Sequence, residues 1–225
     1  MSIEIFCQEI KNEVLLLSSM VEMAVMDSAG ALKDNDIDRS QQVLLHDLNI
    51  NRKRYEIEIS IVVIMATQQP VARDLRMFAA SLDICSELER MGDYAKEIAN
   101  INIRSEGLSL PAILRDIYSM AEKAVDMLHR AMTTFAEEDM QTATAIIDED
   151  DVIDACYTKL YYEAVNNVLG DPRNIERVNY VLWIAHNLER LGDRTTNVCE
   201  RVIYIVTGER PDITPASGKF RLATS

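Results

Sequence analysis

The sequence contains few of the residues that build β-sheets and tight turns. Aromatic residues make up 6% of the 225 residues, and there are only seven glycines and five prolines. Aromatic residues are enriched in strands, whereas glycine and proline are enriched in turns. Alanine, leucine, isoleucine, glutamate and methionine are frequent instead, and these residues favour helices. We therefore predict an all-α protein that is long enough to bury a sizeable core.

Paired cysteines are also absent. Cys7, Cys85, Cys156 and Cys199 are scattered along the chain, and no two of them form a CxxC pair. Zinc knuckles and disulfide frameworks both require closely ordered cysteines, so neither is indicated. Four unpaired thiols fit a reducing cytosol best.

The sequence lacks a long apolar run and an excess of basic residues. The longest apolar run, from Ile61 to Ala66, is far shorter than the ~20 residues needed to cross a bilayer. The first residues, Met1 to Ile5, are acidic rather than basic, and no signal peptide follows them. The formal charge of −14 disfavours binding to nucleic acid or an anionic bilayer, because both attract clustered lysine and arginine. We expect a cytoplasmic protein without direct membrane insertion, whose partners are cations or basic protein surfaces.

Common catalytic motifs are missing as well. The sequence has no Gly-rich phosphate loop, no serine nucleophile elbow and no HExxH element. His46, His129 and His186 share no motif. A ferritin-like di-iron enzyme would need two Glu-x-x-His elements, and the sequence contains none. We therefore assign no catalytic residues and predict that the protein is not an enzyme.

Helical periodicity runs along most of the chain, and none of the five prolines interrupts it. In the first segment the apolar residues recur at steps of three and four, which is typical of an amphipathic helix. Glycines, prolines and capping aspartates divide the chain into six such segments. Their predicted boundaries are Ile3 to Gly30, Asp34 or Asp36 to Gln68, Pro70 to Arg104, Ser109 or Pro111 onwards, Asp139 to Gly170, and Asp171 to Gly208.

The second half of the chain repeats the first. The segment from Glu87 to Asp93 reads ELERMGD, and the segment one hundred positions later reads NLERLGD. Asp36 and Asp139, Asp47 and Asp150, and Asn51 and Asp154 form matching pairs that are each 103 positions apart. We therefore predict two tandem, similar three-helix bundles, in residues 1–107 and 108–208, followed by a loose tail in residues 209–225.

Each copy of the repeated motif carries a glutamate and an aspartate four positions apart: Glu89 and Asp93, then Glu189 and Asp193. Residues four apart share one helix face, and like charges at that spacing repel by about 0.2–0.5 kcal/mol. A glycine precedes each aspartate, and a mid-helix glycine costs about 1 kcal/mol relative to alanine. Both halves therefore require an interaction that offsets these costs.

Acidic residues of the second helix in each half can join these pairs if the second and third helices are antiparallel neighbours. Such oxygen-rich clusters suit divalent or trivalent metal ions, with iron, zinc, manganese, magnesium and calcium as candidates. The predicted metal-binding residues are Asp47, Glu89 and Asp93 in the first half, and Asp150, Asp154, Glu189 and Asp193 in the second. In the alternative interpretation these acids belong to solvated faces, where Asp93 pairs with Lys96 and Glu189 with His186.

Several segments resemble one known family, the PhoU phosphate-transport regulators. The resemblance covers nearly the full length, and its carriers are Gln69 to Arg76, Leu88 to Ala95, Leu188 to Asp193, Asn197, and Val202 to Glu209. It implies two similar three-helix bundles in a cytoplasmic, usually dimeric protein, with multinuclear metal sites on the two motifs. It also implies two partners, the ATPase of the phosphate ABC transporter and a membrane sensor histidine kinase. The family restrains this transporter and, together with the kinase, silences the phosphate-starvation response when phosphate is plentiful.

This sequence departs from symmetry at two matching pairs of positions. Asn51 stands where the second half has Asp154, and Glu97 stands where the second half has Asn197. The two predicted metal sites can therefore differ in charge, in the number of metal ions or in affinity.

Three functional hypotheses follow. The leading one is a non-enzymatic, metal-binding adaptor that passes phosphate status between the transporter and the kinase. The second is a carboxylate-bridged metallohydrolase that acts on phosphate compounds, because paired metal ions activate water. A hydrolase requires a concave pocket with a general base beside the metals, whereas an adaptor can carry its metals on an open face. The third is a metal-free helical scaffold.

Overall fold

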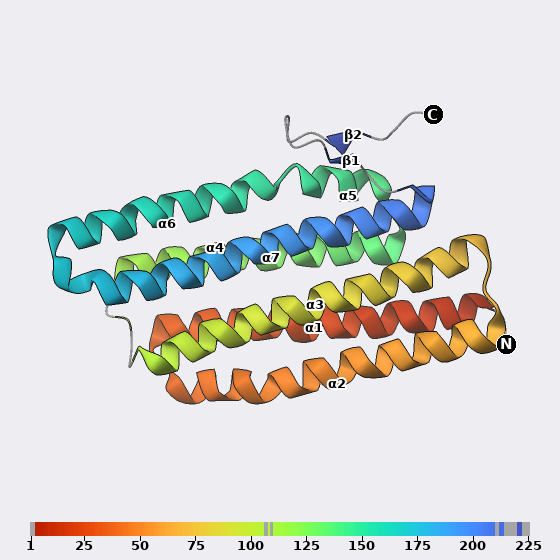
Figure 1. Ribbon diagram of the computed structural model, residues 1–225, viewed down its shortest axis with the longest axis horizontal. Helices are drawn as coiled ribbons and strands as arrows, with labels where there is room; N and C mark the ends of the chain where they lie inside the picture. Colours follow the sequence, from red (N-terminus) through yellow and green to blue (C-terminus); the bar gives the residue numbers. More distant parts are fainter. Residues whose placement is uncertain (1–2, 106–107, 109, 210–211, 214–219, 222–225) are drawn as a thin grey trace.

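The computed structural model describes residues 3–105, 108, 110–209, 212–213 and 220–221. Long helices account for nearly all of this part of the chain (Figure 1). The first half contains α1 (Ile3–Asp34), α2 (Ile37–Gln68) and α3 (Ala72–Arg104). The second half contains α4 (Pro111–Glu137), α5 (Met140–Ile147), α6 (Asp150–Gly170), the 3-10 turn η1 (Pro172–Asn174) and α7 (Ile175–Thr207). The prediction of two tandem three-helix bundles is confirmed, with α5 and α6 together in the place of one helix.

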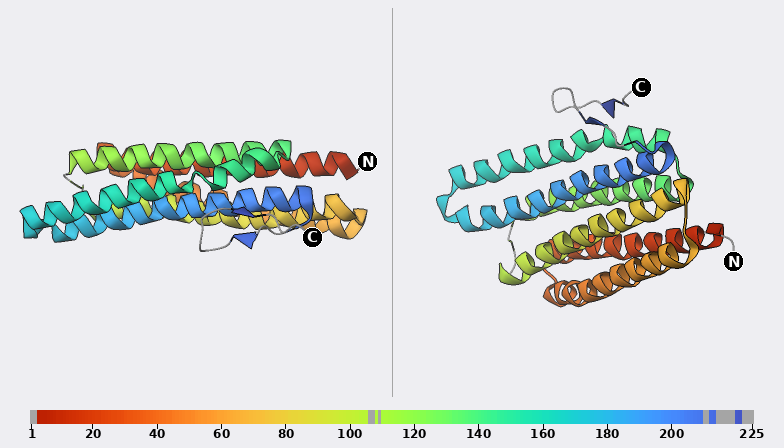
Figure 2. Two further views of the ribbon diagram at one scale, coloured as in Figure 1. Left: turned by 90° about the horizontal axis from the view of Figure 1, so that it is seen from above. Right: turned by 45° about the vertical axis from the view of Figure 1, so that its right-hand side comes forward.

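The bundles lie side by side and share an interface of four helices. α1 and α3 of the first half contact α4 and α7 of the second, whereas α2 and α6 contact only helices of their own half or the adjacent turn among the larger contacts. α2 and α6 therefore lie at opposite edges of the molecule (Figures 1 and 2). Each of these two edge helices keeps one face against its own bundle and turns the other face outwards.

The predicted capping residues start the helices as expected. Asp36 accepts a hydrogen bond from the backbone N–H of Arg39 at the start of α2. Its counterpart Asp139 accepts bonds from the backbone N–H groups of Gln141 and Thr142 at the start of α5. These bonds satisfy backbone donors that have no partner within the first helical turn. The two caps are matching positions of the duplication, so the repeat is preserved in local structure.

The predicted end of the first helix at Gly30 is wrong, because α1 continues to Asp34. Gly30 lies inside the helix, and a Cβ atom there would come 2.6 Å from Nη1 of Arg39. The Arg39 guanidinium crosses this point to form an ion pair with Asp27 at 2.8 Å. The glycine therefore provides room for a neighbouring side chain rather than a helix end.

The fifth helix is interrupted, whereas the sequence predicts one helix from Asp139 to Gly170. α5 ends at Ile147, and α6 begins at Asp150. Four consecutive acidic residues occupy positions 148–151, and the break places two of them in the first turn of α6, where the helix dipole favours negative charge. Arg130 on α4 holds the break through two bonds to the Glu149 carboxylate, at 3.0 and 2.5 Å.

The core is a continuous apolar cluster that runs through both bundles. The stripe predicted on the first helix is buried at Ile10, Val14, Leu17, Val21 and Ala24. α1 is also long and apolar enough, by length and composition, to cross a bilayer, with a mean hydropathy of 1.4 over 18 residues. However, 56% of that window is buried inside the structure, as expected of a core helix that packs against three neighbours.

Two strands of two residues each, β1 (Asp212–Ile213) and β2 (Phe220–Arg221), pair antiparallel after α7. They lie outside both bundles (Figure 1). The predicted loose tail of residues 209–225 falls mostly outside the described residues.

Candidate functional site

The glycine of each repeated motif lies against a side chain of the neighbouring helix. At Gly192 on α7, a Cβ atom would come 2.8 Å from Oδ1 of Asp150 and 3.4 Å from Cγ2 of Ile153. At Gly92 on α3, a Cβ atom would come 3.3 Å from Cγ2 of Ile50. Ile50 and Ile153 are matching residues of α2 and α6, so both halves use the same contact. This packing brings the acids of the second helix to the level of the motif acids, as the antiparallel arrangement predicts.

In the first half, cations of the protein itself neutralise the carboxylates. Asp47 is buried, with 4% of its surface exposed. Its Oδ2 atom accepts a bond from Lys96 Nζ at 2.6 Å and another from Asn51 Nδ2 at 3.2 Å. Lys96 Nζ also lies 3.9 Å from Oδ1 of Asp93. One lysine therefore bridges an acid of α2 and an acid of α3.

The electrostatics of the remaining acids in this half follow from burial and crowding. Burial raises the pKa of Glu89, and the nearby charge of Asp93 raises it further, while Arg54 lowers it. Burial also raises the pKa of Asp93, and Asp47 adds to this effect while Lys96 opposes it. The two positive groups, Arg54 and Lys96, thus act against the repulsion among the three acids.

The second half has the acids without these cations. The residues at the positions matching Arg54 and Lys96 are Tyr157 and Thr196. Burial and the charges of Asp154, Asp193 and Glu189 raise the pKa of Asp150 to about 7. Four carboxylates therefore lie close together, and burial and repulsion both favour the protonated form of Asp150, which lies against Gly192.

The pKa values of two other acids in the second half are also raised. Burial and then the charge of Asp193 raise the pKa values of both Asp154 and Glu189. Oε2 of Glu189 is buried and lies 3.0 Å from Nδ1 of His186. The contact with His186 lowers the pKa of Glu189 and so opposes the effect of burial.

The structure brings the seven predicted residues together as two separate groups, one in each half. Within residues 3–209 as far as they are described, no three His, Cys, Asp or Glu side chains stand in an arrangement that holds a metal ion. The ion pairs of the solvated-face interpretation are present, at 3.9 Å for Lys96 and Asp93 and at 3.0 Å for His186 and Glu189. The carboxylates of each group are thus neighbours that would have to turn towards a common point to bind a metal ion.

Cavities lie elsewhere on the molecule. Four cavities of the described residues, with volumes from about 80 to about 350 Å³, are lined by none of the seven carboxylates. The cavity of about 350 Å³ lies beside the α5–α6 break, between Met127 on α4 and Val152 on α6. The clusters therefore do not sit in any of these four concave pockets.

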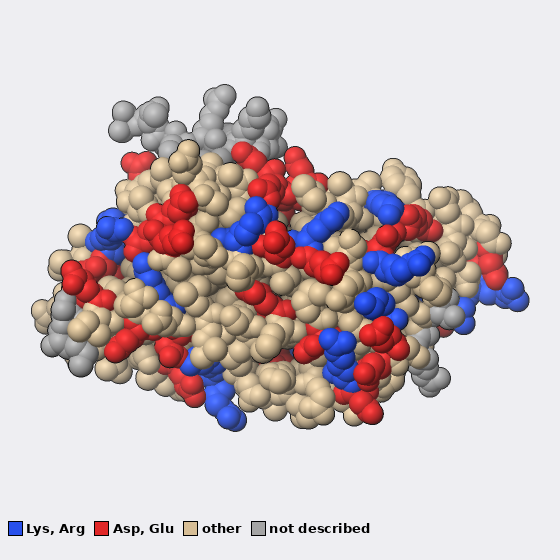
Figure 3. All heavy atoms as spheres, turned by 180° about the vertical axis from the view of Figure 1, so that it is seen from behind, with Lys and Arg blue, Asp and Glu red and all other residues tan. Residues whose placement is uncertain are grey.

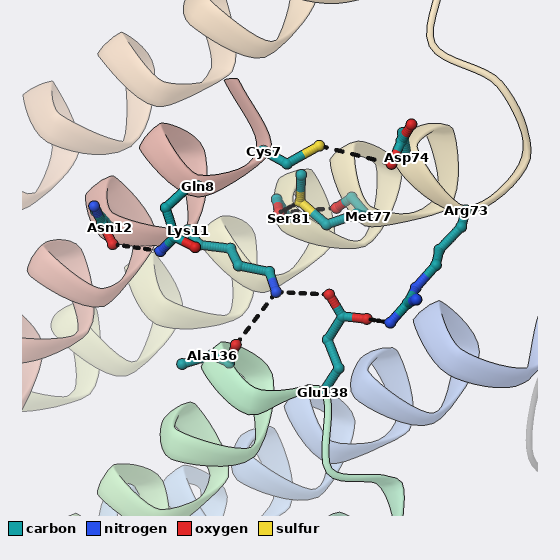
Figure 4. Close-up of polar contacts among 10 residues, drawn as sticks. All are labelled: Cys7, Gln8, Lys11, Asn12, Arg73, Asp74, Met77, Ser81, Ala136 and Glu138. Carbon is teal, nitrogen blue, oxygen red and sulfur yellow. Dashed lines mark hydrogen bonds and ion pairs between the residues drawn. The ribbon is translucent and has the colours of Figure 1, made fainter. Parts of the chain in front are cut away.

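One polar cluster was not predicted from the sequence (Figure 4). Glu138, in the left-handed turn between α4 and α5, accepts a bond from Lys11 Nζ at 2.6 Å and also pairs with Arg73. Lys11 is 8% exposed and donates further to the carbonyl of Ala136 at 3.2 Å. The cluster joins α1 and α3 of the first half to the second half. Such long-range pairs have no local sequence signal.

A second departure from symmetry contributes to the interface between the halves. Asn197 Nδ2 donates to Oε2 of Glu87 at 3.2 Å, and Arg194 Nη1 lies 3.3 Å from the same oxygen. The sequence predicts that the difference between Glu97 and Asn197 affects the metal sites. In the structure Asn197 instead contacts α3 across the junction of the bundles.

A comparison with protein families identifies both halves. The family model described as the PhoU domain matches residues 14–101 and again residues 117–202. The first match lies within α1 to α3 and the second within α4 to α7, so the matches follow the two bundles.

Similar proteins extend over nearly the whole chain. The phosphate-specific transport system accessory protein PhoU homolog of Clostridium acetobutylicum is 32% identical over 92% of this chain and 94% of its own length. The phosphate-specific transport system accessory protein PhoU of Escherichia coli is 31% identical over 90% of this chain and 84% of its own length. The crystal structure of PhoU from Pseudomonas aeruginosa superposes with a TM-score of 0.84, at 32% identity, over 92% of this chain and all of that one. The phosphate transport system regulatory protein PhoU from Streptococcus pneumoniae gives a TM-score of 0.85 at 27% identity, over 94% of this chain and all of that one.

Proposed function

This chain belongs to the PhoU family, and from that premise we propose that it regulates phosphate uptake as a cytoplasmic adaptor. It would link the ATPase of a phosphate ABC transporter to a membrane sensor histidine kinase, and it would work as a homodimer. The observation that carries the proposal is the match of the PhoU domain to both bundles, together with relatives named as transport accessory proteins along nearly their full length.

The surface of the molecule is consistent with protein partners. On the face drawn in Figure 3, acidic and basic side chains are interspersed, without a large basic patch. Nucleic acids and anionic membranes bind to clustered lysine and arginine, so this face does not favour either. An adaptor role also accords with clusters that lie outside the four described cavities, because a hydrolase needs its metals beside a substrate pocket.

We propose that metal ions bind chiefly in the second half. Asp150, Asp154, Glu189 and Asp193 would hold them, and the chemistry of this set fits a hard divalent or trivalent cation. Burial and then the repulsion from neighbouring carboxylates raise the pKa of Asp150 to about 7, and a cation would neutralise that repulsion. Bound there, it would link α6 to α7.

The first half fits a metal ion less well. Lys96 bonds to Asp47 at 2.6 Å, and Asn51 supplies an amide where the second half has a carboxylate. A metal ion at Asp47, Glu89 and Asp93 would have to displace an ammonium group that already provides positive charge. We therefore expect weaker metal binding in this half.

The metal proposal is tested with two matched double variants of protein prepared without a histidine tag. Asp150→Asn with Asp193→Asn should remove most of the bound metal, because it discharges two carboxylates of the stronger site. Asp47→Asn with Asp93→Asn makes the same change at the matching positions and should leave most of the metal in place. Elemental analysis gives the metal content, and helical circular dichroism confirms folding. Equal losses in the two variants would contradict the asymmetry, and a metal-free wild type would contradict metal binding itself.

The regulatory proposal is tested in cells that lack the chromosomal gene. A phosphate-responsive reporter should stay active at high phosphate in these cells, and the wild-type chain should silence it. Failure of the wild-type chain to restore silencing would contradict the adaptor role. Release of phosphate from phosphate esters by the purified wild type, and not by the Asp150→Asn, Asp193→Asn variant, would favour the hydrolase instead.

A further inference from the structure

The outer face of α2 carries an apolar stripe that the bundle does not use. Leu45, Leu48, Tyr55, Ile59 and Val62 are all exposed, with between 46% and 62% of their surfaces accessible. α2 contacts α1 and α3 through its opposite face, on which residues such as Ile50, Ile57 and Ile61 are buried. This helix is therefore apolar on two sides, whereas a surface helix needs only one apolar face.

The exposed residues follow the spacing of a coiled coil. Starting at Leu45, the stripe advances by three, four, three, four and three positions through Leu48, Arg52, Tyr55, Ile59 and Val62. A repeat of 3.5 residues keeps one seam facing a partner helix along its length. This stretch spans roughly 26 Å of helix, so the partner that fits it is another long helix.

The second half of the molecule carries only part of this stripe. α6 occupies the matching edge of the other bundle, and its buried residues Ile153 and Leu160 match Ile50 and Ile57. At the positions that match Leu45 and Leu48, the second half has Asp148, in the break before α6, and Asp151 on α6. The other matching positions of α6 are Ala155, Thr158, Tyr162 and Val165. The first part of the seam is thus apolar in one copy of the duplication and acidic in the other.

The order of residues along the seam is suited to a second copy of the same helix running in the opposite direction. An antiparallel pairing centred between Arg52 and Tyr55 places Leu45 against Val62, and Leu48 against Ile59, twice over by symmetry. The same pairing places the guanidinium of Arg52 against the ring of Tyr55, a favourable cation–π contact. A polar residue at one central position of a coiled coil also fixes its register.

The charges beside the seam complement each other in the same arrangement. Arg52 and Glu56 are exposed, and neither has an ion-pair partner among the described residues. In the antiparallel pair, Arg52 of each copy comes within reach of Glu56 of the other. A two-fold axis makes both contacts at once, as an isologous interface requires.

We propose that two copies of this chain associate antiparallel along the outer faces of their α2 helices. This inference gives a surface to the homodimer named under the proposed function, and it rests on that proposal. The dimer leaves the α6 edge of each copy free for other partners. The acidic cluster in the second half of each copy also lies far from the dimer axis, because α2 and α6 lie at opposite edges of the molecule (Figure 1).

The test measures self-association of the full-length chain by sedimentation. Leu48→Glu and Ile59→Glu should each raise the dimer dissociation constant at least 100-fold, because each buries two carboxylates in the seam. Both positions are exposed in the single chain, so folding should be unaffected by circular dichroism. Tyr162→Glu, at the α6 position that matches Ile59, is the control and should change the constant by less than twofold.

Two results would overturn the proposal. A wild type that stays monomeric at 100 µM would exclude a second copy as the occupant. A dimer that withstands both α2 variants would show that the copies associate through another surface. A monomeric wild type would also contradict the homodimer of the proposed function, whereas neither result bears on the reporter assay, so the regulatory role is judged separately.

The relative direction of the two α2 helices is tested by disulfide trapping in a Cys7→Ser, Cys156→Ser background, which retains only the two buried cysteines. A mixture of Leu45→Cys and Val62→Cys chains should form a mixed disulfide under oxidation, and each variant alone should not. Self-crosslinking of Leu45→Cys alone would indicate a parallel pair and overturn the antiparallel arrangement.

Discussion

Gly192 on α7 lies in close contact with the carboxylate of Asp150 on α6. Because a Cβ atom at Gly192 would lie 2.8 Å from the Asp150 carboxylate, the glycine determines where that carboxylate rests. Gly92 has a different neighbour, since its nearest contact is a methyl group of Ile50 at 3.3 Å. The same motif residue therefore supports a carboxylate in one half and an apolar contact in the other.

Gly192→Ala should reduce metal binding while the fold survives. The new methyl group must push the Asp150 carboxylate aside, whereas the gain in helix propensity, about 1 kcal/mol, offsets part of the strain. Gly92→Ala is the control, because it moves no carboxylate. Elemental analysis of both variants checks this, and a Gly192→Ala protein with the metal content of the wild type would contradict the placement of Asp150.

Glu138→Gln should destabilise the protein at neutral pH by about 1–3 kcal/mol, because it leaves the buried Lys11 ammonium without its carboxylate. Burial works against ionisation of Glu138, but bonds from Lys11 and Arg73 outweigh it and hold the pKa of Glu138 below its usual value. A lowered folded-state pKa contributes stability that is present above about pH 4.5 and is lost as the pH falls further. Urea unfolding at pH 7 and pH 3.5 measures this, and the difference between variant and wild type should shrink at pH 3.5. A difference that is the same at both pH values would contradict the ion-pair role.

At the scale of helices, the sequence predicts which segments are helical better than it predicts where each helix begins and ends. Apolar periodicity and capping aspartates give six helical segments, because burial of one helix face and satisfaction of backbone donors are local requirements. The prediction of a helix end at Gly30 is wrong because the role of this glycine depends on Arg39, a side chain from the next helix. The α5–α6 break carries no glycine or proline, so the acidic run at 148–151 was its only signal. The carboxylate clusters follow from the motif spacing, whereas Lys96 at Asp47 and the cluster at Glu138 depend on tertiary contacts.

Arg130→Ala should loosen the α5–α6 break without unfolding the bundle. Arg130 and Glu149 are 39% and 43% exposed, so the global cost should stay at or below about 1 kcal/mol. Locally, the backbone amides of residues 146–153 should exchange with solvent faster, because the turn loses its contact with α4. Hydrogen exchange measured by mass spectrometry checks this, with Arg115→Ala on the same helix as the control. Unchanged exchange in this segment would show that apolar packing alone sets the break.

At the scale of the whole molecule, the two bundles are joined by residues at which the duplicated copies have diverged. Glu87 on α3 receives Arg194 and Asn197 from α7, while its own counterpart on α7 is Asn187. Tyr94, the counterpart of Arg194, accepts a bond from Arg194 at 3.2 Å and lies under the guanidinium of Arg190, 4.8 Å from the ring centre. Divergence between the copies has thus produced asymmetric polar contacts beside the packing of α1 against α4 and of α3 against α7.

Because the interface is continuous with both cores, the halves should unfold together. The calorimetric enthalpy of the metal-free wild type should equal its van't Hoff enthalpy, as for a single cooperative unit. Glu87→Ala should lower the free energy of unfolding by about 1–3 kcal/mol, since it leaves Arg194 and Asn197 partly buried without their acceptor. Arg90→Ala is the control, because Arg90 pairs with Glu87 from an exposed position on the same helix and should cost no more than about 0.5 kcal/mol. Two separate calorimetric transitions in the wild type would show that each bundle is stable alone and that the diverged contacts merely align them. A single transition in the wild type that becomes two transitions in Glu87→Ala would instead show that the contacts of the Glu87 carboxylate are required for the two halves to unfold together.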